Sequence, residues 1–201
     1  MRKIVLIAFY FLVLGSAVYA ADLVIGGGGL FGMTWEQYHY PDGDGYTNDI
    51  QDVNATTFGA FIFFGLNRYI EGSIAVYAGN NKYTETWNYN RVPDSDEGEF
   101  MSSQIGFSLY LKYPFVLGNF VLFPTLGTDL QNNNGGLDLF LGGGVGFDVY
   151  IGPKLFIRTQ AIYKAGYLML YKGDLNEDTE TKFPAHGPHI KFGLGWNYGR
   201  S

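Results

Sequence analysis

The chain has 201 residues, no cysteine and a formal charge of −6, with 13 basic and 19 acidic side chains. Aromatic residues make up 18% of the chain, charged residues 16%, and there are 29 glycines. This composition disfavours disorder, and it disfavours a helical fold because each glycine costs a helix about 1 kcal/mol. It excludes a disulfide scaffold and a cysteine-zinc site, and the few scattered basic residues disfavour a nucleic-acid partner.

The N-terminal segment has the pattern of a secretory signal peptide. Arg2-Lys3 precedes the apolar run Ile4–Leu14, which is short for a membrane anchor of about 20 residues. Val18-Tyr19-Ala20 then supplies the small residues that suit cleavage. We therefore expect residues 1–20 to be removed and residues 21–201 to form one exported domain. No later segment has the pattern of a membrane helix, so a membrane role would require strands.

Residues 137–171 give the clearest strand pattern. From Leu137 to Ile151 every second residue is apolar, with one glycine among them, and the residues between include Asp138, Asp148 and three glycines. Gly152-Pro153-Lys154 then predicts a turn into a second arm. An apolar face opposite a face of glycine and charge indicates strands of a transmembrane β-barrel, with lipid outside and a packed polar lumen inside.

Eight such segments follow one another, and the connections between them alternate between long and short. We expect strands at 22–38, 56–66, 69–88, 100–113, 120–130, 137–151, 155–171 and 186–198. Long loops outside and short periplasmic turns are typical of outer-membrane barrels. A soluble lipocalin-type barrel also has eight strands, but its interior is apolar, whereas the less apolar face here carries Gln104, Lys112 and Arg158. The sequence therefore predicts an all-β fold, an eight-stranded antiparallel up-and-down transmembrane β-barrel.

The exported part of the chain thus resembles the small eight-stranded outer-membrane proteins of the OmpX, opacity-protein and OmpW type. The resemblance is architectural and includes the assembly signal with which such proteins commonly end, alternating apolar residues that close on an aromatic. The matching residues are Ile190, Phe192, Leu194, Trp196 and Tyr198. Here three further residues follow this pattern, which departs from the family. The resemblance implies a location in the outer membrane, contact with its lipid and insertion by the barrel-assembly machinery.

Aromatic residues near the strand ends should form girdles at the two membrane interfaces. The residues expected there are Trp35, Tyr69, Tyr113, Phe120, Tyr150, Tyr167 and Trp196.

The charged residues expected on the inner face are nearly balanced. They are Glu71, Asp129, Asp138, Asp148, Lys112, Arg158, Lys164 and Lys191. If the turn centres on Pro153, Asp148 lies opposite Arg158, and Glu71 and Lys112 lie near the periplasmic ends of adjacent strands. The interior of an eight-stranded barrel is only wide enough for side chains, so buried charges there must pair. We favour a plugging network of ion pairs over the alternative, a polar conduction path.

Twelve of the 19 acidic residues fall in the three long loops, which share one mouth of the predicted barrel. They are Asp42, Asp44, Asp49, Asp52, Asp94, Asp96, Glu97, Glu99, Asp174, Glu177, Asp178 and Glu180. Such acidic, tyrosine-rich loops suit contact with a host or envelope ligand, because rigid aromatic side chains make good anchors. The expected contact residues are Tyr40, Asp42, Asp44, Tyr46, Asp94, Asp96 and Glu97. Asp42–Gly45 resembles part of a calcium-binding loop, but it lacks the later ligands of an EF-hand. The alternative to ligand contact is therefore a simply solvated acidic surface.

Two further patterns point to chemistry less strongly. Gly27–Gly32 satisfies G-x-G-x-x-G, but no helix follows it, as a dinucleotide site requires. His39, His186 and His189 lie at the ends of two strands that become neighbours when the barrel closes, which makes them weak candidates for a zinc site or an acid/base pair.

These observations favour a structural or adhesin-like role for the predicted barrel. The alternative is a porin-like narrow channel for small molecules, including hydrophobic ones, which the resemblance to OmpW implies. A lipid-modifying outer-membrane enzyme comes third, because such enzymes pair a histidine with serine or aspartate, and no serine lies near the three histidines. We expect no catalytic residue, no metal and no cofactor.

Overall fold

The computed structural model describes residues 23–40, 46–65, 67–89, 92–133, 136–171 and 180–199, and the predicted signal peptide lies outside them. The strands are β1 (Val24–Tyr40), β2 (Tyr46–Gly65), β3 (Ile70–Tyr89), β4 (Val92–Lys112), β5 (Phe115–Leu117), β6 (Phe120–Asn133), β7 (Gly136–Tyr150), β8 (Leu155–Tyr171) and β9 (Glu180–Asn197). Within the described ranges, no helix is long and apolar enough to cross a membrane.

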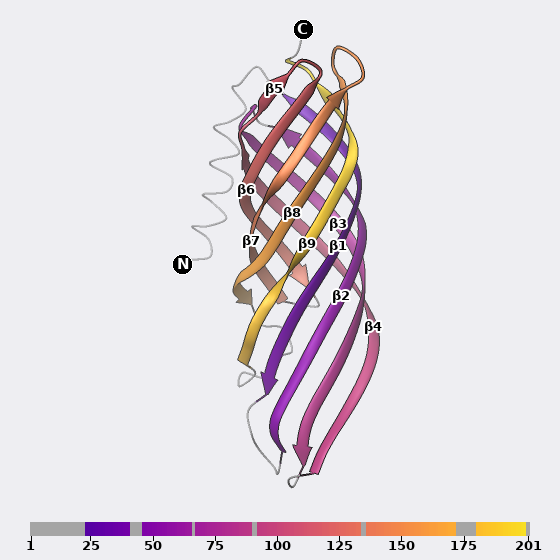
Figure 1. Ribbon diagram of the computed structural model, residues 1–201, viewed down its shortest axis with the longest axis vertical. Coiled ribbons are helices and arrows are strands. Elements are labelled where there is room, and N and C mark those ends of the chain that lie inside the picture. The colour runs from indigo at the N-terminus through magenta and orange to yellow at the C-terminus, as the bar shows by residue number, and fades with distance from the viewer. Residues whose placement is uncertain are drawn as a thin grey trace.

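The eight long strands form a closed antiparallel ring (Figure 1). Their order is β4-β3-β2-β1-β9-β8-β7-β6, and β4 pairs with β6 to complete the circle. The short β5 pairs only with the start of β6, from Phe115 opposite Leu122 to Leu117 opposite Phe120. Neighbours in sequence are thus neighbours in the sheet. The predicted eight-stranded up-and-down barrel is confirmed, with β5 as an addition at one of the short turns.

The three long connections are much shorter than the sequence pattern predicts, and these predictions were wrong. β2 begins at Tyr46 instead of residue 56, β4 at Val92 instead of residue 100, and β9 at Glu180 instead of residue 186. The apolar alternation stops where the wall leaves lipid, but backbone pairing does not. At the tip of the β3–β4 hairpin, Tyr89 still pairs with Val92. A strand in water keeps its ladder while both of its faces are polar.

The wall of the barrel is uneven in height. β4 pairs with β3 from Val92 to Leu111, but it pairs with β6 only from Gln104 to Lys112. In Figure 1 the ends of β2, β3 and β4 accordingly extend well past the corresponding ends of β6, β7 and β8. We call the part of this sheet beyond the β4–β6 pairing the extension; its edge on β4 comprises residues 92–103.

The two faces of the wall differ as predicted. Large apolar side chains cover the outside, including Phe58 at 60% exposure and Leu126 at 66%, whereas Phe63 and Arg158 inside are at most 1% exposed. In a soluble protein so many exposed apolar residues would be anomalous, but they suit lipid.

One predicted girdle residue faces the wrong way. Trp35, Tyr69, Tyr113, Phe120 and Trp196 are on the outside, and the side chain of Tyr167 lies outside the described residues. Tyr150 is instead buried, and its hydroxyl accepts a hydrogen bond of 3.0 Å from the side-chain amide of Asn197. The reason is its position two residues after Asp148, since alternate residues of a strand share a face.

Candidate functional site

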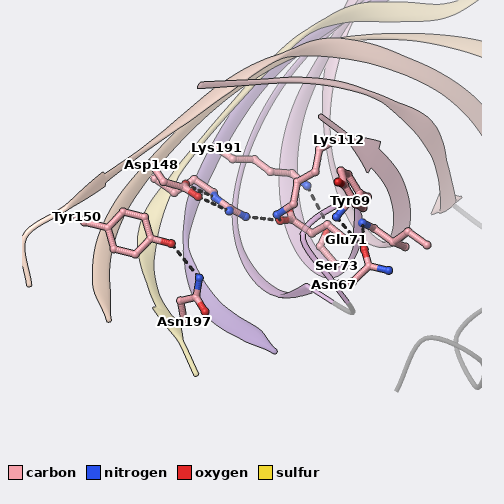
Figure 2. Close-up of polar contacts among 11 residues, drawn as sticks. Asn67, Tyr69, Glu71, Ser73, Lys112, Asp148, Tyr150, Lys191 and Asn197 are labelled. Atoms are coloured by element: carbon pink, nitrogen blue, oxygen red, sulfur yellow. Dashed lines mark hydrogen bonds and ion pairs between the residues drawn. The ribbon is translucent and has the colours of Figure 1, made fainter. Parts of the chain in front are cut away.

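A cluster of ion pairs crosses the lumen in the half of the barrel that holds the short turns (Figure 2). Arg158 on β8 donates from Nε to Oδ1 of Asp148 on β7 over 2.7 Å, and from Nη2 to Oδ2 over 2.8 Å. Its third nitrogen, Nη1, donates to Glu71 on β3. The same Glu71 oxygen accepts a bond of 2.7 Å from Nζ of Lys112 on β4. Two cations and two carboxylates from four strands therefore tie opposite walls together.

Aromatic rings enclose the centre of this cluster. The guanidinium carbon of Arg158 lies 4.2 Å from the ring centre of Phe63, 5.0 Å from that of Phe123 and 5.2 Å from that of Phe156. Positive charge over an aromatic face is attracted by the ring quadrupole, more strongly where water is excluded. The Arg158 side chain is 1% exposed. We call Arg158, its two carboxylates, Lys112 and the three rings the seal.

Glycines on the neighbouring strands make room for these rings. A Cβ added at Gly146 would meet carbons of the Phe123 ring at 2.5 Å, and one added at Gly195 would overlap the ring of Phe156. These contacts are shorter than any that real side chains tolerate. The glycines on the inner face of the sequence thus have a packing role, because they let phenyl rings lie flat against the wall of a narrow barrel.

The middle of the lumen holds further buried charges. Lys164 pairs with Asp129, which also accepts a hydrogen bond of 3.1 Å from the hydroxyl of Ser108. Lys191 donates to the hydroxyl of Ser73 over 3.0 Å and lies 5.3 Å from the ring centre of Phe61. Within the described part of the chain, several buried polar atoms here have no hydrogen-bond partner, and most of them come from different strands. They include Thr57 Oγ1, Tyr77 OH, Thr125 Oγ1, Asp129 Oδ1 and His189 Nε2.

The structure brings together the two lumen pairs expected from the register, Asp148 with Arg158 and Glu71 with Lys112. Lys164, Lys191 and Asp138 also face inward, as expected, with Asp138 only half buried. The sequence interpretation missed the bond between Arg158 and Glu71, the aromatic enclosure, and the partners of Lys164 and Lys191. The sequence does contain a pattern that could have predicted this enclosure: glycines lie on the strands next to those that carry Phe123 and Phe156.

The histidines do not converge within the described residues. His189 is buried in the lumen, whereas His186 faces outward, with its ring centre 6.0 Å from Trp35 and 6.3 Å from Tyr163. The odd spacing between them places the two side chains on opposite faces of β9. The His39 side chain is not among those described. No group of three metal-binding side chains occurs in the described part of the chain.

The acidic residues expected to lie in the second long loop lie in a strand instead. Asp94, Asp96 and Glu97 belong to the exposed first half of β4, so their assignment to a loop was wrong. Glu99 follows them and forms an ion pair of 2.8 Å with Lys82 on β3. Asp42 and Asp44 lie outside the described residues, as do the side chains of Tyr40 and Tyr46. These described acidic residues therefore lie on a strand of the extension.

A closed antiparallel ring of eight long strands, with an apolar outer face and a charged, packed interior, defines a small β-barrel of the outer-membrane type. The sequence matches no family model and no curated protein. The fold is similar to that of the outer membrane protein OprG from Pseudomonas aeruginosa. The two chains are 13% identical, the match covers 89% of this chain and 96% of OprG, and the TM-score is 0.55. The predicted resemblance to small outer-membrane barrels is therefore confirmed at the level of fold.

A second match, the outer membrane protease OmpT from Escherichia coli, has a TM-score of 0.37 at 9% identity, covering 88% of this chain and 96% of OmpT. A score this low supports no comparison of activity.

Proposed function

We propose that the protein is an integral outer-membrane protein with a structural, adhesin-like role, whose lumen is closed and whose extension presents an acidic surface outside the cell. The observation that carries this proposal is the seal. Arg158 reaches across the lumen to Glu71 while three phenyl rings fill the space around it. A barrel of eight strands has little interior space beyond its side chains.

The charge arrangement in the seal supports closure. Arg158 and Lys112 face Asp148 and Glu71, so each charge has an opposite charge within hydrogen-bond distance. Separating such a pair in a desolvated interior costs about 3–5 kcal/mol when one partner is left uncompensated. A transient opening that broke the seal would therefore be rare.

The extension supports the adhesin-like part of the proposal. It carries Asp94, Asp96, Glu97 and Glu99 on exposed strand positions beyond the barrel ring. Its end is opposite to the short turns, and outer-membrane barrels place short turns in the periplasm. The acidic surface then faces away from the cell. A structural, adhesin-like role does not require catalysis, and we propose that the protein is not an enzyme.

Conductance tests the closed lumen. Purified full-length protein in a planar lipid bilayer should give no steady ion conductance, whereas the Arg158→Ala variant, which removes the centre of the seal, should give measurable current. Steady conductance from the unaltered monomer would contradict the proposal.

A second candidate, a narrow channel for small molecules, is favoured by one observation. The middle of the lumen contains buried polar atoms that have no hydrogen-bond partner among the described residues, including Thr57 Oγ1 and His189 Nε2. Buried polar atoms of this kind commonly bind water, which a conduction path also requires. The channel would then need the seal to move. Solute uptake into proteoliposomes tests it, and comparison of outer-membrane lipids by mass spectrometry with and without the protein tests the third candidate, a lipid-modifying enzyme.

A further inference from the structure

The charged side chains that are buried in the lumen do not balance. Among the described residues they comprise four cations and three carboxylates, each 8% exposed or less: Lys112, Arg158, Lys164, Lys191, Glu71, Asp129 and Asp148. The two cations and two carboxylates of the seal cancel. Asp129 forms an ion pair with Lys164. One positive charge is left over, and it belongs to Lys191.

Lys191 has only neutral groups close to it within the described part of the chain. Its Nζ donates to Ser73 Oγ on β3 over 3.0 Å (Figure 2). The same nitrogen lies 5.3 Å from the ring centre of Phe61 and 5.7 Å from that of Tyr110. Ring faces attract a cation but do not cancel its charge. An ammonium group has three N–H donors, so two remain for a ligand, and a buried charge without a counter-charge is strongly unfavourable.

Further hydrogen-bond donors face this part of the lumen. Ser73 accepts the bond from Lys191, so its own hydroxyl proton can still be donated. His189 lies two residues from Lys191 on the same face of β9. A Cβ added at Gly32 would overlap the His189 ring and lie 2.8 Å from Thr57 Oγ1, so these two buried side chains meet over that glycine. Thr57 Oγ1 and His189 Nε2 have no hydrogen-bond partner among the described residues.

The remaining charge and the available space define the ligand. The excess is one positive charge, and the groups around it are N–H and O–H donors, which together select an anion with a single charge. Asp138 does not supply that charge: Lys191 is level with Gly146 of β7 through Gln160, and Asp138 lies eight residues farther along β7. The interior of an eight-stranded barrel is only wide enough for side chains, so the anion must be small.

We propose that Lys191 and Ser73 bind a small monovalent inorganic anion, of the size of chloride, in the middle of the lumen, with His189 and Thr57 as further donors. Hydrogen bonds from the ammonium group to the anion replace the hydration that Lys191 has lost. Ser73 is two residues from Glu71, on the side of the seal away from the short turns. The anion therefore enters from the opposite mouth. This inference goes beyond the proposed function and does not depend on it.

The chloride dependence of stability is the first test, and it uses the unaltered full-length protein in a neutral detergent. Urea unfolding is measured while chloride replaces gluconate, an anion too large for the lumen. Total salt is held at about 1 M, where exposed charges are screened in both salts. The folded-to-unfolded ratio should rise with chloride as 1 + [chloride]/Kd, about tenfold at roughly nine times the dissociation constant. A ratio that does not change up to full replacement would overturn the proposal.

Removal of the excess cation should remove the chloride effect. Lys191→Met keeps most of the side-chain length, and no described carboxylate loses an ion-pair partner, so the variant should be no less stable than the unaltered protein in gluconate. Its unfolding should no longer respond to chloride. Arg68→Met, the matched control, removes an exposed cation in a turn and should keep the full chloride response. A chloride response that survives in Lys191→Met would overturn the assignment of the site.

Bromide locates the anion without any variant. Anomalous diffraction from crystals of the unaltered protein grown in bromide should give a peak within hydrogen-bond distance of Lys191 Nζ and Ser73 Oγ. Bromide peaks only at other places would overturn the proposal, as would a water molecule in that position, because the lysine would then have no anionic partner. A peak at Lys191 without a chloride effect on unfolding would show binding at crystal concentration only and would also overturn it.

Discussion

The two ends of this barrel hold charged residues under opposite conditions. Around the seal, Glu71 is 5% exposed and contacts two cations, Lys112 and Arg158. In the extension, Glu99 is exposed and contacts Lys82 across a single pair. A buried charge has lost its hydration, so its stability depends on oppositely charged partners. An exposed charge is stabilised by water and gains little from a partner. The interior end is therefore fixed in one arrangement, whereas the charges of the exposed end do not depend on one.

The largest difference between the two ends should appear when an arginine is removed. Arg158→Met leaves Asp148 buried without a cation, and we expect a loss of about 3–5 kcal/mol in the free energy of unfolding. Urea unfolding followed by heat-modifiable gel mobility measures it. Arg68→Met is the matched control, because Arg68 is an exposed residue of a short turn, with its guanidinium carbon 5.4 Å from the ring centre of Tyr69. Similar losses in both variants would contradict the seal.

A positive charge on the outer face separates the part of the wall in lipid from the part in water. Val145 is 47% exposed on the outside of β7, and Val145→Arg should cost about 2–4 kcal/mol, as charges do near the bilayer midplane. Glu97→Arg, on the extension, should leave the unfolding free energy almost unchanged. Equal tolerance of both substitutions, measured by unfolding in lipid vesicles, would place Val145 outside the membrane.

Glycines provide a smaller test of packing in the seal. Gly195→Ala forces the ring of Phe156 to move, and overpacking of this kind costs about 1–3 kcal/mol. Gly152→Ala is the control, since a Cβ at Gly152 meets nothing within 4 Å and its backbone needs no positive φ. The same urea titration compares the two variants. A Gly195→Ala protein as stable as Gly152→Ala would show that the ring can be rearranged freely.

The smallest effect should come from the exposed pair of the extension. A hydrogen bond from Lys82 lowers the pKa of Glu99, so this carboxylate stays charged at a lower pH than an ordinary glutamate. A group with a lowered folded-state pKa stabilises the fold above its unfolded pKa, and this contribution disappears as the pH falls through the folded value. Lys82→Met should raise the pKa of Glu99, followed by NMR, toward its ordinary value, with the hydrogen bond from Asn80 still lowering it, and should leave the unfolding midpoint without a measurable change. An unshifted titration in the unaltered protein would contradict the pair.

Much of the barrel was predictable because its signals are local. The turn at Gly152–Lys154 fixes the register of β7 against β8, so the pairing of Asp148 with Arg158 follows from counting residues. The bond between Arg158 and Glu71 was not predictable in this way. It joins residues 87 positions apart on strands that are not neighbours in the ring. Which side chains meet across a lumen depends on the stagger of all eight strands, and no sequence pattern states that stagger.

The strand ends were the other failure, and they mark the limit of the sequence pattern. Alternation of apolar and polar residues shows where a strand has lipid on one face, so by itself the sequence determined the number of strands, their two faces and the positions of the short turns. Only the tertiary structure decided that β4 continues to Val92 and that its described pairing with β6 starts only at Gln104. In water the length of a strand depends on backbone pairing with its neighbours, and this pairing does not require an apolar face.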